Sequence, residues 1–385
     1  MAAGHGMAGG RRAVAAWVLY DWAYGAFTTV VSTFVFATYF TRAVAPDPAS
    51  GAALWAGGQA AAGVLIALLS VPLALGLAGL ATVAFEIACV FYNAMLPGLA
   101  RPARLGRLSM LAWGAGYAGG LTCLGLCLVV LVAPASPPFG LDPAQAEPVR
   151  ATALLAGAWM ALFAWPCVVF VPEAGRRQPW GAAVRGGLAD LRGVLGDVAR
   201  VAPLRRFLLA RLFFMDGLTT LFAFGGIYAA GEFGLDAKQV LVFGIALNVS
   251  AGLGAAGFAL IEDKIGPKAC VLASLFALSV LGTALLLVHD VALFWVLGVS
   301  LGVFVGPAQA ASRSMMARMA PAEARTAWFG LFALSGRVTA FLGPAALAVV
   351  TAAFHSQRAG MGVIVVFLVA GAALLARVPS PGAER

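Results

Sequence analysis

The sequence predicts an all-α membrane protein that crosses the bilayer many times. Hydrophobic residues fill 62% of its 385 positions and charged residues 11%, whereas soluble domains average about 45–50% and about 25%. Long apolar runs alternate with short polar breaks, and many runs reach the length of about 20 residues that a spanning helix needs. The basic residues behind the net charge of +9 lie in those breaks, as expected of cytoplasmic loops.

The apolar runs give about eleven candidate spans. They cover residues 14–41, 53–71, 74–97, 107–133, 151–172, 203–231, 237–260, 268–288, 291–317, 324–352 and 360–377. The longest polar interval, 173–202, predicts a cytoplasmic linker with an amphipathic surface helix whose arginines lie near lipid headgroups. We therefore expect an N-terminal helical bundle over 1–172, this linker, and a C-terminal six-helix bundle over 203–385.

The two halves of the chain share an internal repeat, which is common in transporters. Asp21 in YDWAYGAFTT matches Asp216 in FMDGLTTLFA, at an offset of 195 residues. A following glycine- and alanine-rich segment repeats at an offset of 189, and the segment from Asn93 matches that from Arg313 at an offset of 220. Because the offset rises once, the first half is predicted to lack about one helix and its loop between Ser70 and Asn93.

Loop charges give a consistent sidedness only after residue 101. Basic residues within 101–107, 176–177 and 264–268 mark three cytoplasmic loops. Upstream, cytoplasmic Arg11 and Arg12 would require an even number of crossings before residue 101, whereas three spans are counted. Three explanations stay open: an external amino terminus, an apolar segment around Pro72 that enters the membrane without crossing it, or a truncated gene product.

Ionisable residues inside the spans are candidates for a transport pathway, since each costs about 2.5–3.5 kcal/mol to insert and therefore faces a cavity or a partner. Asp21 and Asp216 lie on equivalent helices, so we expect them at a central pathway, where one or both bind a proton or a substrate ammonium. Local capping is the alternative. Glu86 stands alone in FEIACVF, which suits either proton coupling or a structural hydrogen bond to Tyr92 or Asn93.

Further polar side chains fit the same pathway. Amides at mid-helix or helix-end depth are Asn93, Asn248 and Gln309. Arg337 lies midway along the predicted span 324–352, too deep to reach either surface, so it should meet an acid or a substrate carboxylate. Arg211 is expected to be a cytoplasmic anchor, and Arg313 to contact lipid or a loop.

Other function classes find no support in the sequence. It holds no G-x-x-x-x-G-K-[ST] motif, which argues against an ATP-driven pump. The three histidines have neither metal-ligand nor catalytic-triad spacing. No basic helix suggests nucleic-acid binding. We expect no catalytic residue, no metal and no cofactor; the expected partners are the lipid bilayer, a small-molecule substrate and protons, and the expected state is a monomer in a bacterial inner membrane.

Six segments carry a family resemblance. They are AWVLYDWAYGAF near the start, FYNAMLP at 91–97, FFMDGLTTLFAFGGIYAAGEFG at 213–234, FGIALNVSAGLGA at 243–255, GPAQAASRSMMARMAP at 306–321 and FGLFALSGRVTAFLGP at 329–344. With them the chain resembles the vacuole-effluxer-like branch of the major facilitator superfamily, whose eukaryotic members are amino-acid effluxers. The resemblance implies a twelve-helix, six-plus-six arrangement with cytoplasmic termini and alternating access around a central cavity.

The chain departs from the family pattern where the internal repeat does. The loop after the second helix is absent, together with most of the third helix. The matching loop in the second half survives, and the resemblance implies that it latches the helices during conformational switching; its residues are Gly257, Asp263, Lys264, Gly266 and Lys268. Two hypotheses follow. The chain is a secondary transporter, with efflux of amino acids or similar solutes coupled to protons, or it is a shortened, transport-deficient relative that acts as a membrane scaffold or regulator.

Overall fold

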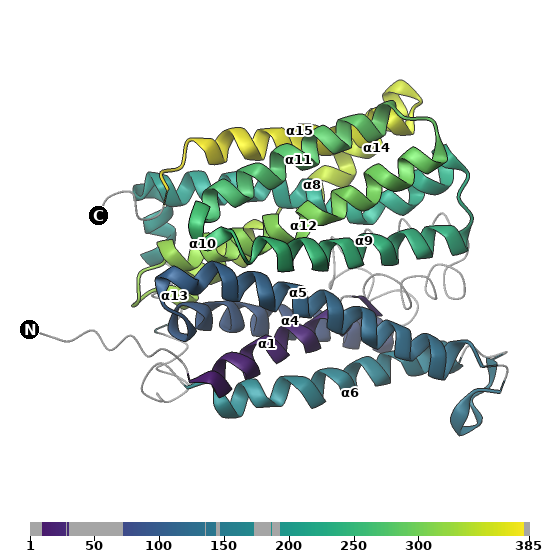
Figure 1. Ribbon diagram of the computed structural model, residues 1–385, viewed down its shortest axis with the longest axis horizontal. Coiled ribbons are helices and arrows are strands. Elements are labelled where there is room, and N and C mark those ends of the chain that lie inside the picture. Colours follow the sequence, from purple (N-terminus) through teal and green to yellow (C-terminus); the bar gives the residue numbers. More distant parts are fainter. Residues whose placement is uncertain are drawn as a thin grey trace, which may run out of the picture. The chain divides into compact units, whose positions relative to one another are not determined.

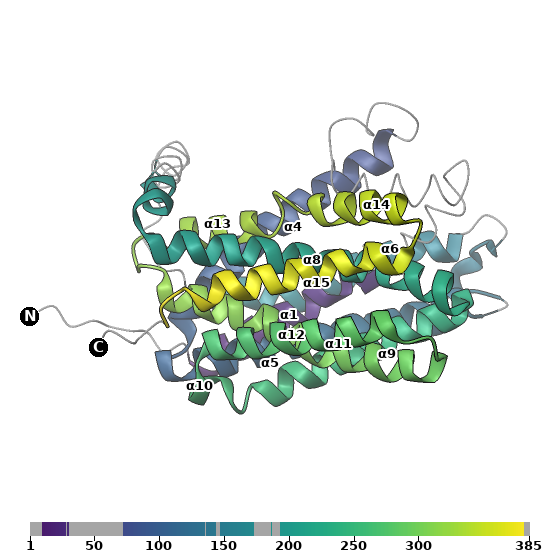
Figure 2. The same cartoon turned by 90° about the horizontal axis from the view of Figure 1, so that it is seen from above.

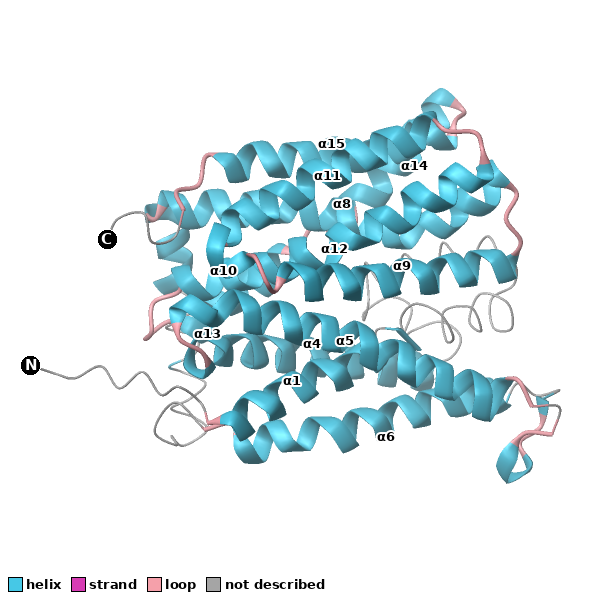
Figure 3. Cartoon of the chain, viewed as in Figure 1, coloured by secondary structure: helices cyan, strands magenta, loops and turns pink. Residues whose placement is uncertain are grey.

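The described part of the protein is entirely helical. The computed structural model describes residues 10–27, 29–30, 72–134, 136–143, 147–172, 186 and 193–380. Within these ranges the regular elements are helices joined by loops and turns, with no strand (Figure 3). Seven of the described helices are long and apolar enough to cross a membrane. The prediction of an all-α, multi-pass membrane protein is confirmed.

The helices follow the predicted spans closely (Figure 1). They are α1 (Arg11–Ala26), α4 (Pro72–Leu99), α5 (Leu105–Leu126), α6 (Glu147–Phe170), α8 (Ala202–Phe233), α9 (Ala237–Phe258), α10 (Glu262–Ile265), α11 (Pro267–Leu287), α12 (Val291–Met319), α13 (Arg325–Ser335), α14 (Leu342–Phe354) and α15 (Gln357–Ala376). A π-helical segment, Cys127–Val132, extends α5. The predicted span 53–71 and the second half of the span 14–41 lie outside the described residues, as does most of the linker 173–202, of which 193–200 are helical.

One predicted span is not a continuous helix. Residues 324–352 form α13 and α14, separated by turns at 336–341. Two residues explain the break. Gly336 weakens the helix, and Pro344 lacks the N–H that a continuous helix needs and would clash with the carbonyl one turn earlier. Arg337 therefore lies in a break between two helices, rather than midway along one.

Several helix ends are fixed by side chains that accept backbone hydrogen bonds. Asp236 and Gln239 form a reciprocal capping box at the start of α9. Asp290 accepts a hydrogen bond from the Leu293 amide at 2.8 Å at the start of α12. At the end of α8, Gly234 adopts a left-handed conformation with φ of 67°. These caps satisfy amide and carbonyl groups that have no partner inside the helix.

The chain divides into two compact units. The described residues of the first are 86–111, 186 and 193–380, and those of the second are 10–27, 29–30, 72–85, 112–134, 136–143 and 147–172. In the first unit, α8 packs against α15, α11 against α12 and α15, and α9 against α12. Figures 1 and 2 show α9, α11, α12 and α15 running alongside one another. Both α4 and α5 contribute residues to each unit. The expected bundle boundary at 173–202 stays a prediction.

In the second unit, α1 packs on α6 and closely on α5. A Cβ atom added to Gly119 would lie 2.0 Å from the Trp22 carbonyl oxygen, and one added to Gly25 would lie 1.8 Å from that of Gly116. Only glycine permits this backbone approach, as is usual where membrane helices touch. Gly25 of α1 and Gly119 of α5 thus allow the two helices to pack closely.

Candidate functional site

The break between α13 and α14 frees backbone groups, and buried side chains of α8 bind them. Asp216 is 1% exposed, and its Oδ2 accepts a hydrogen bond from the Gly343 amide at 3.1 Å. The Thr220 hydroxyl donates to the Asp216 carbonyl at 2.8 Å. Among the described residues, Asp216 Oδ1 has no hydrogen-bond partner. Asp216 therefore caps the helix break through one of its two carboxylate oxygens.

Arg211, one turn earlier on α8, binds the other side of the break. Its guanidinium donates hydrogen bonds to the Phe332 carbonyl and, at 3.0 Å, to the Ser335 hydroxyl, and it lies 3.6 Å from the centre of the Phe332 ring. The side chain is only 7% exposed. The expectation of a cytoplasmic surface anchor is wrong, because the carbonyl groups at the end of α13 need a donor.

Arg337 and Glu86 form an ion pair at the same break. Their side chains are 56% and 29% exposed, respectively. The prediction that Arg337 meets an acid is confirmed. The partner of Glu86 is thus Arg337, a residue far away in the sequence. We call Arg211, Asp216, Arg337 and Glu86 the break cluster. It contains three predicted pathway residues: Glu86 on α4, Asp216 on α8 and Arg337 between α13 and α14.

Arg313 of α12 lies in a second polar cluster, which we call the helix-end cluster. It is 1% exposed. Its Nε donates to the Ser109 hydroxyl at 2.9 Å, and its Nη2 donates to the Ser109 carbonyl at 2.6 Å. Its Nη1 donates to Asn93 Oδ1 at 3.4 Å. The expectation of a lipid or loop contact is wrong: the guanidinium joins α12 to the end of α4 and the start of α5.

Asp263 of α10 caps the start of α5. Its Oδ1 accepts a hydrogen bond from the Gly106 amide at 3.0 Å, and its Oδ2 accepts one from the Arg107 amide at 3.2 Å. Arg318 of α12 lies 3.3 Å from the same carboxylate. The first amides of a helix have no partner inside the helix and carry partial positive charge, which favours a carboxylate there.

Glu262, next to Asp263, was not among the predicted site residues. It is fully buried. The Ser314 hydroxyl donates to its Oε1, and a Cβ atom added to Gly106 would lie 2.4 Å from its carboxyl carbon. Burial raises the pKa of this carboxyl from 4.5 to about 7. Its place beside Asp263 in the loop motif IEDKIGPK is the only signal that the sequence offered.

The remaining predicted site residues lie apart from these clusters. Asn248 donates to the Gly244 carbonyl of its own helix at 2.8 Å, and Gln309 lies half-buried on α12. Asp21 is buried on α1, in the second unit. In the predicted switch loop, Lys268 donates to the Ala376 carbonyl at 2.9 Å. The others lie at the end of α9 and around α10: Gly257, Lys264 and Gly266, the last with φ of 85°.

A third polar group, also absent from the predictions, lies where α8 and α11 end and α15 begins. Arg358 Nε pairs with Glu232 Oε2 at 2.8 Å. Its Nη1 donates to the Leu286 and Val288 carbonyls at 3.0 and 2.7 Å. These carbonyls belong to the last turn of α11, so the arginine has an evident structural role as a helix cap.

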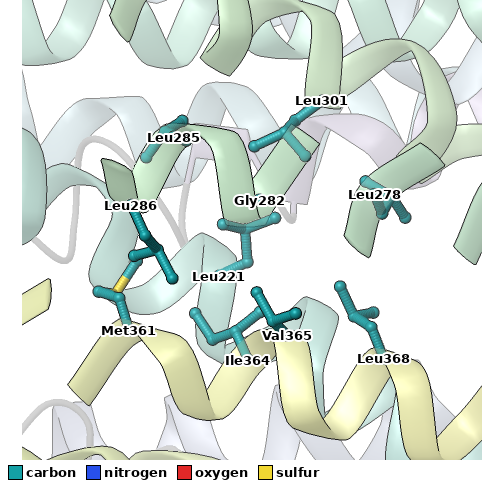
Figure 4. A pocket seen from close by; sticks show the side chains of 10 residues that line it. All are labelled: Leu221, Leu278, Gly282, Leu285, Leu286, Leu301, Met361, Ile364, Val365 and Leu368. Carbon is teal, nitrogen blue, oxygen red and sulfur yellow. The ribbon is translucent and has the colours of Figure 1, made fainter. Parts of the chain in front are cut away.

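An apolar pocket lies between α8, α11, α12 and α15 (Figure 4). Leu278, Leu301 and Leu368 are among its lining side chains, which are all aliphatic or methionine apart from one glycine. Its volume of about 30 Å³ has room for about two water molecules. It is a packing void, too small and too apolar to bind a polar substrate.

Comparison with known proteins identifies the family. The model of the family described as "Vacuole effluxer Atg22 like" matches residues 64–385. An uncharacterized MFS-type transporter, YxiO of Bacillus subtilis, is 22% identical over an alignment of 414 positions, which covers 94% of each chain. Autophagy-related protein 22 of Cryptococcus neoformans is 24% identical over 293 residues, covering 71% of this chain and 52% of that protein.

Solved structures agree on the fold. The major facilitator superfamily transporter FucP, in the outward conformation, superposes with a TM-score of 0.62 at 13% identity, over 97% of this chain and 88% of that chain. The proton:xylose symporter XylE superposes with a TM-score of 0.63 at 13% identity, over 96% of each chain. This chain is thus a multi-pass membrane transporter of the major facilitator type, not an enzyme, and it belongs to the vacuole effluxer Atg22-like family.

Proposed function

We propose that this transporter exports amino acids or similar small zwitterions from the cytoplasm, coupled to proton movement. The break cluster carries the proposal, above all the ion pair between Arg337 and Glu86. Charged side chains inside a membrane span favour a water-filled cavity or a partner. The half-exposed state of the pair is compatible with such a cavity at the helix break.

The charges of the break cluster suit a zwitterion. Arg211 has no carboxylate within ion-pair distance among the described residues and binds a carbonyl, a hydroxyl and an aromatic ring. A substrate carboxylate that approaches Arg337 would therefore meet positive charge. The substrate ammonium would find Glu86 or the open oxygen of Asp216. Guanidinium groups bind carboxylates well because their geometries match.

Proton coupling follows from competition at the same carboxylates. When a substrate carboxylate replaces Glu86 on Arg337, Glu86 is released from its counter-ion. Asp216 adds a second proton acceptor on the neighbouring helix. Asp21, its repeat counterpart on α1, is proposed to serve the other half of the pathway, together with Asn93, Asn248 and Gln309 as polar lining groups.

Alternating access also needs contacts that break and reform, and the helix-end cluster supplies candidates. Asp263 and Arg313 join α10 and α12 to the segment 86–111. We assign this loop, with Gly257, Lys264, Gly266 and Lys268, as the conformational-switch loop. The bacterial relative that aligns along nearly the whole chain supports a plasma (inner) membrane location.

Purified protein in liposomes provides the test. Amino acids added singly across an imposed pH gradient should move protons, measured with an internal pH-sensitive dye. Asp216→Asn should reduce this flux to that of empty liposomes, while Glu323→Gln, a change at an exposed carboxylate, should leave it unchanged. Undiminished substrate-dependent flux in Asp216→Asn, with normal flux in the control, would contradict the proposed pathway.

The shortened first half favours a second candidate, a transport-deficient scaffold or regulator. The alignment to the Bacillus relative spans 414 positions although this chain has 385 residues, so that relative contains residues that this chain lacks. If no solute drives proton flux, and a variant that restores the missing loop and helix gains it, this second function is the correct one.

A further inference from the structure

Glu262 is a buried carboxyl at the point where α10, α12 and the start of α5 meet. It is 0% exposed. Gly106 of α5 packs directly on the carboxyl group, leaving no room there for a larger side chain. Among the described residues, Oε2 has no hydrogen-bond partner. An ionised carboxylate without a direct ion pair is unstable in such a place, because burial penalises the charged form.

The hydrogens available at Ser314 also indicate a neutral Glu262. The Ser314 hydroxyl has a single hydrogen, yet it lies within hydrogen-bond distance of Glu262 Oε1 and of the Ala311 carbonyl, the latter at 3.1 Å. With an ionised carboxylate, the single hydrogen of Ser314 must be shared between two acceptors, whereas a protonated carboxyl supplies a second hydrogen and gives each contact its own hydrogen bond. A protonated Glu262 donates to the Ser314 oxygen, and Ser314 then donates to the Ala311 carbonyl.

The neighbouring charges do not replace that proton. Arg313 directs its donors to Ser109 and Asn93. Arg318 lies within ion-pair distance of Asp263. The charges of Arg318 and Arg313 favour ionisation of Glu262 and that of Asp263 opposes it, but burial is the largest effect and keeps the pKa of Glu262 raised. The other titratable group facing Glu262 is the Cys270 thiol of α11.

We propose that Glu262 is a proton-binding site that controls the contact between the loop around α10 and the segment 86–111. This inference rests on the alternating-access function proposed above and adds a proton site outside the break cluster. With Glu262 protonated, the segment packs against α10 and Asp263 caps α5. When Glu262 ionises, its charge requires water, and the contact opens.

The direction of the pH effect follows from the two pKa values. In the packed arrangement the pKa of Glu262 is raised to about 7, whereas a water-exposed glutamate has the ordinary value of 4.5. The packed arrangement therefore binds the proton more tightly. Its advantage is complete below pH 4.5 and is lost as pH rises to about 7. Between these values the packed-to-open ratio falls by up to about tenfold per pH unit, the slope for one proton.

Distance measurements between two spin labels test the proposal without any substrate. Gly98 near the end of α4 has no atom near an added Cβ, and Leu260 in the loop is 68% exposed; both accept a label after replacement by cysteine. The five native cysteines are first replaced by alanine. In lipid nanodiscs, the fraction of long label distances should rise with pH up to about 7. Loss of a protonated-carboxyl infrared band should follow the same curve.

Matched variants separate Glu262 from the other carboxylates. Glu262→Gln reproduces the neutral acid, since its amide donates to Ser314, so the short distance should persist at every pH and the infrared band should be missing. Glu323→Gln, an exposed carboxylate beyond α12, should keep the wild-type pH curve. A pH curve that survives in Glu262→Gln, or constant distances in the wild type, would overturn the proposal. Neither result would bear on substrate flux at the break cluster.

Discussion

Two helix pairs occupy equivalent positions in the internal repeat, and they differ in whether the second helix of the pair is continuous or broken. In the second unit α1 packs on α5, and in the first unit α8 packs on α13 and α14. The helices α5 and α13 begin at Leu105 and Arg325, which are separated by the repeat offset of 220. Yet α5 continues for 22 residues, whereas α13 ends after 11.

Small sequence differences account for the contrast. Gly119 and Gly120 of α5, which touch the α1 backbone, correspond to Thr339 and Ala340 in the second copy. Leu124 corresponds to Pro344, which cannot continue a helix. The first copy therefore buries glycine backbone, while the second breaks and exposes backbone groups that Asp216 and Arg211 must satisfy. The backbone groups freed by a broken helix require polar side chains from a neighbouring helix as hydrogen-bond partners, whereas a continuous helix satisfies its own.

The largest expected effect lies in the continuous copy. Gly119→Leu forces a side chain onto the Trp22 carbonyl, so α1 and α5 must separate, and the unfolding free energy should fall by about 3 kcal/mol or more. Thermal unfolding in detergent measures it as a lower Tm. Gly157→Leu in α6, where an added Cβ meets nothing within 4 Å, is the control. Equal Tm values for both variants would show that the close approach is not needed.

The next effect lies in the broken copy. Asp216→Leu leaves the buried Gly343 amide without an acceptor, which should cost about 1–3 kcal/mol. Asp216→Asn keeps an acceptor oxygen and should unfold near the wild-type Tm, although we expect it to lose transport. Comparing Tm and proton flux for the two variants separates capping from proton binding. If Asp216→Asn unfolds as early as Asp216→Leu, the capping explanation fails.

A smaller effect on stability is expected for the exposed ion pair. Because the Arg337 side chain is 56% exposed, Arg337→Gln or Glu86→Gln should change the unfolding free energy by less than about 1 kcal/mol. Substrate flux should nevertheless fall in both variants. A double-mutant cycle on Tm, with flux measured in parallel, checks this. A large coupling in Tm would mark the pair as structural instead of functional.

The smallest expected effect tests α13 itself. Gly330 lies inside this short helix, and an added Cβ would meet nothing within 4 Å. Gly330→Ala should stabilise the protein by up to about 1 kcal/mol, since alanine loses less backbone freedom in a helix. A small rise in Tm is the expected result. A fall would mean that the break needs a flexible α13.

Local sequence features predicted the helices and several of the contacts. Apolar run length located α4, α5, α6, α8, α9, α11, α12 and α15 within a few residues, because a lipid environment demands long hydrophobic helices. The cost of a buried guanidinium predicted that Arg337 meets an acid. The internal repeat placed Asp21 and Asp216 on equivalent helices. The break at 336–341 was also present in the sequence, as Gly336 and Pro344, but the apolar run concealed it.

Other features depended on contacts between residues far apart in the chain. Hydropathy placed Arg211 and Arg313 at the membrane surface, yet both are buried, because the carbonyl, hydroxyl and amide groups that bind them come from other helices. In the sequence Glu262 resembles any loop carboxylate, and only the structure shows that Gly106 and Ser314 enclose it. The sequence by itself determined which segments are helices in a membrane, since that depends on local polarity. Only the tertiary structure decided which polar groups are buried and paired, since their partners lie up to 251 positions away.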